Sequence, residues 1–154
     1  FNAQIANDNS DGQIVLSGRN EDLAFVSKIL KDNKIKNIKL PVSAPFHCEL
    51  MTKATEIMRK ELEKVDFKKT NNTLISNVTA EEISDVEDLK NLLISQIEKR
   101  VRWRESIINM INYGVNQFIE IGPGKVLSGL IKRINKNVKI TSINNQSDIE
   151  SLRI

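Results

Sequence analysis

The sequence predicts an α/β fold with a parallel sheet. Short runs rich in Ile, Val and Leu alternate with longer segments whose apolar residues recur at helical spacing, the order that parallel α/β sheets produce. The chain has 154 residues, 40% of them hydrophobic, which is enough for one domain with a buried core. Together these observations favour a globular α/β chain.

Residues 1–42 are predicted to form a small unit of strand, strand, helix and strand. The strands are expected at 3–6, 13–17 and 36–42 and the helix at 21–33, with the cluster 8–12 as the turn between the first two strands. This order is that of a ferredoxin-like βαββαβ unit without its opening strand and helix. Because that opening strand is central, its absence would leave an unpaired edge that invites pairing with another chain.

Residues 43–154 are predicted to carry the parallel sheet. Helices are expected at 49–64, 86–99, 104–113 and 125–134, and strands at 73–78, 117–121 and 138–142. The turn Gly122-Pro123-Gly124-Lys125 precedes a helix, but it lacks the spacing and the Lys-Ser/Thr ending of a Walker phosphate loop. It therefore favours a tight strand-to-helix turn over a phosphate site.

Composition narrows the class of protein. The formal net charge is +3, and the basic residues are scattered among acidic ones, which predicts a mixed surface rather than a nucleic-acid-binding face. No apolar run is long enough for a bilayer span, and the first residues do not resemble a signal peptide. Cys48 is the only cysteine, so no intrachain disulfide is possible, which fits a reducing cytoplasm. No His, Cys, Asp or Glu spacing suggests a metal site.

His47 is the only histidine and the best candidate for chemistry. It lies in the run LPVSAPFHCELM, residues 40–51, where a strand-like segment and two prolines precede a helix start. Near neutral pH an imidazole can both accept and donate a proton, and such corners project side chains into clefts. The spacing alone leaves a second interpretation open, namely a structural histidine satisfied by its neighbours. Neighbouring side chains point apart, so Cys48 is expected to be an inert thiol rather than a nucleophile paired with His47.

Five blocks in register resemble malonyl-CoA:acyl carrier protein transacylases of type II fatty acid synthesis. They are NDNSDGQIVLSG at 7–18, LPVSAPFHCELM at 40–51, SNV at 76–78, VRW at 101–103 and FIEIGPGKVLSGL at 118–130. No single block is decisive, but together they cover almost the whole chain. The resemblance implies the C-terminal part of an acyltransferase: an α/β-hydrolase-like parallel sheet over 43–154 and an incomplete ferredoxin-like small subdomain over 1–42.

The resemblance also assigns candidate site residues. By it, His47 is the base that activates a serine and later protonates the leaving thiolate, and the backbone carbonyl of Gln96 orients the imidazole. Phe46 would crowd the space that an α-methyl group needs, which goes with malonyl as the substrate. Asn9 would line the cleft between subdomains, although an Asn here also suits a turn. The family often has proline where this chain has Asp11, which leaves the exact turn open.

Malonyl-CoA and acyl carrier protein are the partners that the resemblance implies, with transfer by a ping-pong mechanism through an acyl-serine. No cofactor is expected, because the coenzyme A thioester is itself a substrate. The mild positive charge suits both anionic partners. Neither nucleic acid nor membrane is an expected partner.

Three motifs of the family do not occur in the sequence. They are the Gly-His-Ser-Leu-Gly elbow with its nucleophilic serine, the Gly-Gln-Gly-Ser-Gln loop of the oxyanion hole, and the arginine that binds the malonyl carboxylate. The sequence therefore resembles the C-terminal half of the enzyme, beginning inside the small subdomain, and the first residue, which is not Met, fits such a start. We expect the chain alone to be inactive and the N-terminal half to be its partner.

Two other hypotheses stay open. The chain could come from an acyltransferase domain of a polyketide synthase or from a malonate decarboxylase subunit, which genomic neighbours would distinguish. It could instead be a non-catalytic remnant that binds acyl carrier protein, for which the distinguishing result is binding without turnover.

Overall fold

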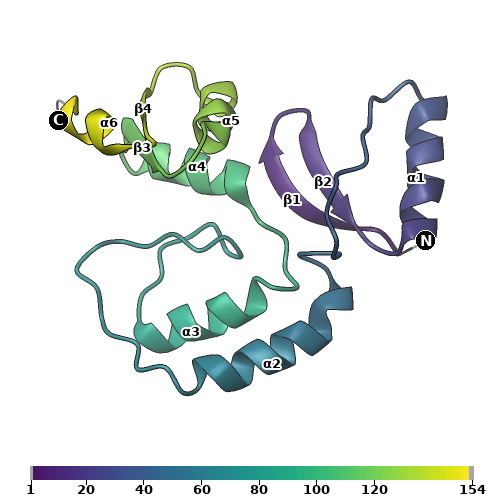
Figure 1. Ribbon diagram of the computed structural model, residues 1–154, viewed down its shortest axis with the longest axis horizontal. Coiled ribbons are helices and arrows are strands. Elements are labelled where there is room, and N and C mark those ends of the chain that lie inside the picture. The colour runs from purple at the N-terminus through teal and green to yellow at the C-terminus, as the bar shows by residue number, and fades with distance from the viewer. Residues whose placement is uncertain (1, 153–154) are drawn as a thin grey trace.

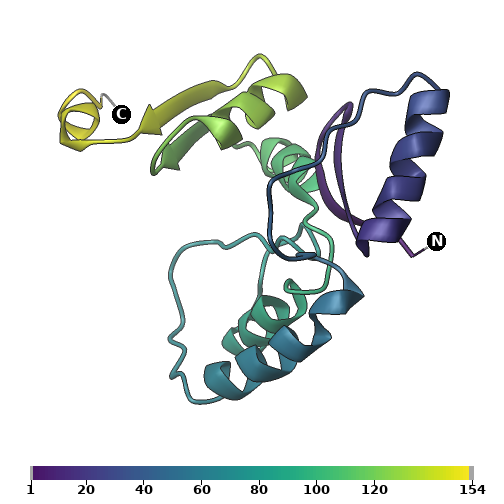
Figure 2. The same cartoon turned by 45° about the vertical axis from the view of Figure 1, so that its right-hand side comes forward.

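A computed structural model describes residues 2–152 of the chain, which fall into three groups of elements (Figure 1). A hairpin and a helix within residues 4–32 form the first group, and two helices within 52–95 form the second. A helix at 103–112 leads into the third, which contains the strands and helices of residues 117–150. The turned view shows the same grouping (Figure 2).

Strands β1 (Gln4–Ser10) and β2 (Gln13–Ser17) pair in an antiparallel hairpin, so this prediction is confirmed. The predicted turn at 8–12 is wrong at its start, because β1 continues to Ser10 and only residues 11 and 12 form the turn. The reason is a pair of backbone hydrogen bonds with the distant residue Val101. The amide of Asp8 donates to the carbonyl of Val101 at 2.9 Å, and the amide of Val101 donates to the carbonyl of Ala6 at 2.8 Å. These bonds outweigh the turn preference of the Asn and Asp residues.

Helix α1 (Asn20–Asp32) agrees with the predicted helix, but none of its residues is buried. The predicted strand at 36–42 is wrong, because this segment has no regular secondary structure. An extended segment becomes a strand only when a neighbour accepts its backbone hydrogen bonds, and none of the strands described between residues 2 and 152 pairs with it. Its apolar side chains face solvent, with Ile38 75% exposed.

The second group is a pair of packed helices. A short 3-10 turn at Glu49–Met51 leads into α2 (Thr52–Leu62), which packs against α3 (Val86–Ser95). Both helices lie where they are expected, and each ends a few residues early. The predicted strand at 73–78 is wrong, because only an isolated bridge between Ile75 and Glu82 forms there before a tight turn at 76–80.

The third group is the parallel α/β unit that the sequence predicts. Strands β3 (Gln117–Ile121) and β4 (Lys139–Ile143) pair in parallel, and α5 (Val126–Ile134) connects them. Helix α4 (Trp103–Asn112) packs on α5 and on β1, so it joins this unit to the hairpin. The short α6 (Gln146–Glu150) is not predicted, because its five residues include a single apolar one, Ile149, which makes no pattern; Asn145 caps it.

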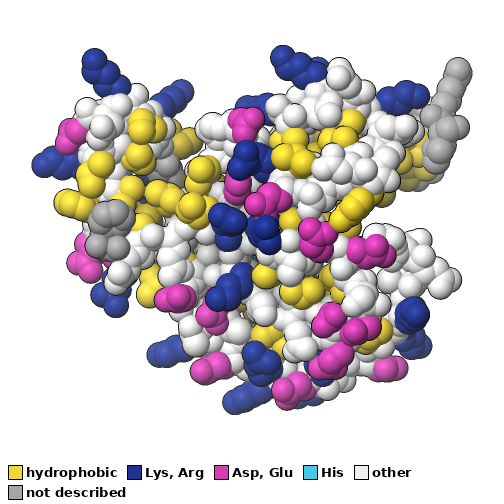
Figure 3. Space-filling model, turned by 180° about the vertical axis from the view of Figure 1, so that it is seen from behind, with side chains coloured by type: hydrophobic (Ala, Val, Ile, Leu, Met, Phe, Trp, Pro, Cys, Tyr) yellow, Lys and Arg dark blue, Asp and Glu magenta, His cyan; other side chains and the backbone are white. Residues whose placement is uncertain are grey.

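Apolar side chains are both buried and exposed. The buried apolar residues come from β1, α3, α4, α5 and the loop at Cys48; they include Ala6, Cys48, Ile94, Ile107, Leu130 and Ile131. On the face seen in Figure 3, apolar side chains gather toward the two upper sides, while acidic and basic side chains are interleaved across the centre and the lower part. This face thus carries no patch of one charge, as the sequence predicts.

Candidate active site

His47 lies at a corner held by two other segments of the chain. Its φ is +60°, a left-handed value that few residues other than glycine adopt. Its amide donates to the carbonyl of Ile97 at 3.1 Å, and the next amide but one, that of Glu49, donates to the Gln4 side chain at 3.0 Å. Because the surroundings hold this unusual backbone in place, the corner has the over-determined geometry that is common at functional sites. The corner follows a loop, not the strand that the sequence predicts.

The imidazole of His47 has a defined hydrogen-bond partner. Its Nδ1 lies 2.7 Å from the backbone carbonyl oxygen of Gln96. A carbonyl oxygen can only accept, so this contact requires the proton on Nδ1; in the neutral imidazole the lone pair is then on Nε2. The ring is half-buried, so Nε2 is available as a base on one side while Nδ1 is fixed on the other.

Gln96 supplies this carbonyl because helix α3 ends there. Gln96 is the C-terminal cap residue of α3, and the last carbonyls of a helix have no partner within it. One of them therefore can accept from His47, and the negative end of the helix dipole faces the ring. The side chain of Gln96 is held separately, since Asn77 Nδ2 donates to its Oε1 at 3.3 Å.

The other two predicted site residues are Phe46, next to His47 in the sequence, and Asn9, on strand β1. Phe46 directly precedes His47, and its side chain is half-exposed. Asn9 lies in β1, whose first residue Gln4 binds the amide beside the histidine corner. Among the hydrogen bonds given for residues 2–152, none joins Asn9 to His47 or to Gln96. The structure therefore links β1 to the histidine corner through Gln4, and not through a hydrogen bond of Asn9.

Three residues of this region were missed by the sequence reasoning. Asn77 belongs to a block used for the resemblance, but nothing in the block pointed to a contact with Gln96. Gln4 and Arg104 gave no signal in the sequence. Gln4 accepts a hydrogen bond from Glu49, 45 positions away in the chain, and Arg104 donates to Asp8, 96 positions away. Such pairings depend on the tertiary fold and not on local pattern.

The Gly122–Lys125 turn does not leave a free anion site. The carboxylate of Glu120 accepts from the amides of Leu127 and Ser128 at 3.0 and 2.8 Å, at the start of α5. Hydrogen bonds from Ser128 and from these amides lower the pKa of Glu120. The helix start is thus already occupied by a carboxylate, in agreement with a structural turn.

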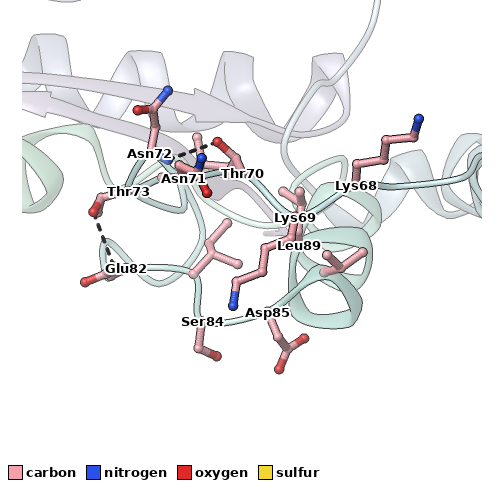
Figure 4. Close-up of a pocket in the computed structure, with 13 residues that line it drawn as sticks. Lys68, Lys69, Thr70, Asn71, Asn72, Thr73, Glu82, Ser84, Asp85 and Leu89 are labelled. Carbon is pink, nitrogen blue, oxygen red and sulfur yellow. Dashed lines mark hydrogen bonds between the residues drawn. The ribbon is translucent and has the colours of Figure 1, made fainter.

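A shallow hollow lies elsewhere, between the 68–74 loop and the start of α3. Two lysines on its wall, Lys68 and Lys69, extend in different directions (Figure 4). Its polar contacts are internal: Thr73 Oγ1 donates to Glu82 at 3.3 Å and the amide of Asn72 donates to Thr70. Its lining holds the lysines Lys68 and Lys69 and the carboxylates of Glu82 and Asp85, but no histidine or cysteine. Over residues 2–152, no group of three His, Cys, Asp or Glu side chains is gathered as a metal ion would require.

Comparison with known proteins decides the family. A malonyl CoA-acyl carrier protein transacylase of Bacillus subtilis (strain 168) is 44% identical over 148 residues, which make up 96% of this chain and 47% of that protein. The crystal structure of such a transacylase from Clostridium perfringens matches with a TM-score of 0.92 at 42% identity, over 97% of this chain and 47% of that one. The homologues that cover almost all of this chain are malonyl CoA-acyl carrier protein transacylases. No protein-family model matches it.

The family resemblance seen in the sequence is therefore confirmed, together with the mixed α/β fold. A further solved structure, a malonyl-transacylase in complex with a type II polyketide acyl-carrier protein, matches with a TM-score of 0.92 at 31% identity. It covers 97% of this chain and 48% of that chain. The chain spans about half the length of the transacylases that it matches. No helix among the described residues is long and apolar enough to cross a bilayer.

Proposed function

We propose that this chain takes part in the transfer of a malonyl group from malonyl-CoA to the phosphopantetheine thiol of acyl carrier protein, and that His47 is its acid–base group. The observation that carries the proposal is the 2.7 Å contact between His47 Nδ1 and the Gln96 carbonyl. This contact favours the tautomer in which Nε2 can accept a proton. The reaction itself is proposed from the names of the relatives, which are malonyl CoA-acyl carrier protein transacylases.

In the proposed first half-reaction, Nε2 of His47 accepts the proton of a serine hydroxyl as its oxygen attacks the thioester carbonyl of malonyl-CoA. The tetrahedral intermediate breaks its carbon–sulfur bond, and the imidazolium returns the proton to the leaving thiolate of coenzyme A. In the second half-reaction, Nε2 accepts the proton of the carrier thiol, whose sulfur attacks the acyl-serine. The carbon–oxygen bond breaks and the serine regains the proton. The Gln96 carbonyl accepts from Nδ1 throughout.

No cofactor is needed for this sequence of steps, because the thioester supplies the activated acyl group. Phe46, next to the base, is proposed to contact the malonyl group and to disfavour an added α-methyl. Asn9 is proposed to line the same cleft from β1. The single thiol, that of the buried Cys48, is proposed to remain reduced in the cytoplasm.

The serine, the oxyanion-hole loop and the carboxylate-binding arginine are proposed to come from an N-terminal half that this sequence does not contain. The exposed apolar side chains support this proposal, since Ile38, Val42 and Ile121 all face solvent here. In this proposal residues 1–42 complete a ferredoxin-like small subdomain, and 43–154 complete the large one.

Reconstitution tests the proposal. The chain alone, given malonyl-CoA and the phosphopantetheine form of acyl carrier protein, is expected to form no malonylated carrier. Mixed with the separately produced N-terminal half of the Bacillus subtilis transacylase, it is expected to restore transfer, measured by mass spectrometry of the carrier. His47→Ala should lower the restored rate by at least about a thousandfold, whereas Glu56→Gln, on the exposed face of α2, should not change it. Transfer by the chain alone, or equal rates with His47→Ala, would refute the proposed role.

A second candidate function is transfer to a polyketide carrier, which the solved complex with a type II polyketide carrier favours. The two functions differ in the carrier and not in the chemistry of His47. Rates measured with carriers of the two kinds, in the same reconstituted mixture, distinguish them. A chain that binds either carrier but never supports transfer would instead be the non-catalytic remnant.

A further inference from the structure

Arg104 ties the tip of the hairpin to helix α4. Its Nε lies 3.1 and 3.3 Å from the two carboxylate oxygens of Asp8, and its Nη2 lies 3.1 Å from one of them. Its Nη1 donates to Asp11 Oδ1 at 3.0 Å. One guanidinium therefore holds two carboxylates, on both sides of the end of β1. An arginine can do this because its planar fork offers several donors in fixed directions.

The two carboxylates differ in their surroundings. The Asp8 side chain is 12% exposed and that of Asp11 is 86% exposed, with Arg104 in between at 38%. The hydrogen bond with Asp8 and the charge of Asp8 raise the pKa of Arg104, which is a cation at neutral pH. The contact with Asp8 is thus the main anchor, and that with Asp11 is a more solvated second contact.

Strand β1 is anchored along its whole length to the parts of the chain that carry the site. Near its start, Gln4 accepts from the amide of Glu49, two residues after His47. In its middle, Ala6 and Asp8 exchange backbone hydrogen bonds with Val101, in the segment that follows Gln96. At its end, Arg104 holds Asp8 and Asp11, the residues on either side of Asn9 and Ser10. The position of Asn9 relative to His47 is therefore set by β1 and fixed at its far end by Arg104.

We propose that Arg104 is a positioning residue of the transacylase site, which fixes Asn9 at the cleft by holding Asp8 and Asp11. This inference rests on the proposed function. Arg104 touches neither substrate nor His47; it acts through the backbone between the two aspartates. When Arg104 is removed, the hairpin tip loses this anchor while the bonds at Gln4 and Val101 stay. Substrate binding by Asn9 should then weaken, and proton transfer at His47 should not.

The test is steady-state kinetics of the reconstituted enzyme with malonyl-CoA. Arg104→Gln is expected to raise KM roughly tenfold and to leave kcat within about twofold, because the lost geometry concerns binding and not the acid–base step. Asp8→Asn should act in the same direction, and Asp11→Asn should give a smaller rise because its contact is solvated. Lys64→Gln is the matched control: it breaks an exposed pair with Glu61 far from the hairpin and should change neither constant.

A double variant decides whether Arg104 acts through Asn9. Asn9→Ala alone should raise KM, and Arg104→Gln added to it should raise KM no further, since both remove the same contribution. Full additivity would overturn the inference. A fall in kcat at unchanged KM would also overturn it, because that result places the effect of Arg104 on the acid–base step and not on substrate binding. If Arg104→Gln does not fold, Asp11→Asn decides alone: a raised KM supports the inference and an unchanged KM overturns it. Absence of transfer by the wild-type mixture would overturn the proposed function, and the inference with it.

Discussion

The β3–α5–β4 unit and the N-terminal hairpin–α1 group have similar patterns of apolar residues in the sequence, but they differ in how far those residues are buried and paired. In the first unit, two strands pair in parallel, α5 buries Leu130 and Ile131, and Glu120 binds the start of the helix. In the second group, α1 buries no residue and the segment 36–42 pairs with no described strand. The difference shows that an alternating apolar pattern becomes a strand only where the same structure supplies its neighbour.

The largest expected effect contrasts one side chain from each region. Ile131→Ala, at 4% exposure on α5, should destabilise the chain by about 3 kcal/mol, because it leaves a cavity in the best-packed part of the molecule. Ile29→Ala, at 39% exposure on α1, should cost less than about 1 kcal/mol. Urea denaturation followed by circular dichroism measures both. Equal losses would mean that α1 is as firmly packed as α5, and the contrast between the regions would not hold.

Whether an element can be predicted from the sequence depends on whether its partners lie nearby in the chain. The β3–α5–β4 unit is predictable because its partners lie within about 30 residues of one another and its turn carries the glycines that the backbone needs. The site is predictable only in part: His47 is visible as a lone histidine, whereas Gln96 as its partner comes from family resemblance. The contacts of Gln4, Asn77 and Arg104 join distant segments, so neither periodicity nor spacing reveals them.

The second prediction concerns the segment 36–42. When the N-terminal half is added, backbone amide exchange of residues 36–42 should slow by about a hundredfold, because a strand partner gives these amides acceptors. Residues 117–121 in β3 serve as the internal reference, since most of their protection exists beforehand. Hydrogen exchange with mass spectrometry, with and without the added half, gives the ratio. Exchange that stays equally fast on binding would mean that 36–42 remains a loop in the complex.

Two glycines, one just before α5 and one within it, test the backbone geometry of the C-terminal unit. Gly124 has a φ of +94°, so Gly124→Ala should destabilise by about 1 kcal/mol even though a Cβ would meet no atom within 4 Å. Gly129 lies inside α5 with equally open space, so Gly129→Ala should stabilise by about 0.5–1 kcal/mol through helix propensity. Urea midpoints of the two variants should therefore move in opposite directions. A shift in the same direction for both would contradict the strand–turn–helix geometry described for 117–134.

The smallest expected effect is the pH dependence of the same unit. The pKa of Glu120 is lowered from 4.5 by hydrogen bonds from Ser128 and the helix amides, so the folded state binds a proton there less readily than the unfolded state does. Its contribution is present above the unfolded pKa and is lost as the pH falls through the folded pKa. Because the group is solvated, the contribution should be only a few tenths of a kcal/mol.

Glu120→Gln tests this linkage, since the amide oxygen can still accept one hydrogen bond but no longer titrates. The difference in unfolding free energy between the native chain and this variant should be largest at pH 7 and smaller at pH 3. Urea titrations at the two pH values measure it, and Glu150→Gln, on the exposed face of α6, controls for the general effect of removing a negative charge. A difference that is the same at both pH values would assign the loss to packing of the amide. The stabilisation of the start of α5 by Glu120 would then come from packing and neutral hydrogen bonds, and not from the charge of the carboxylate.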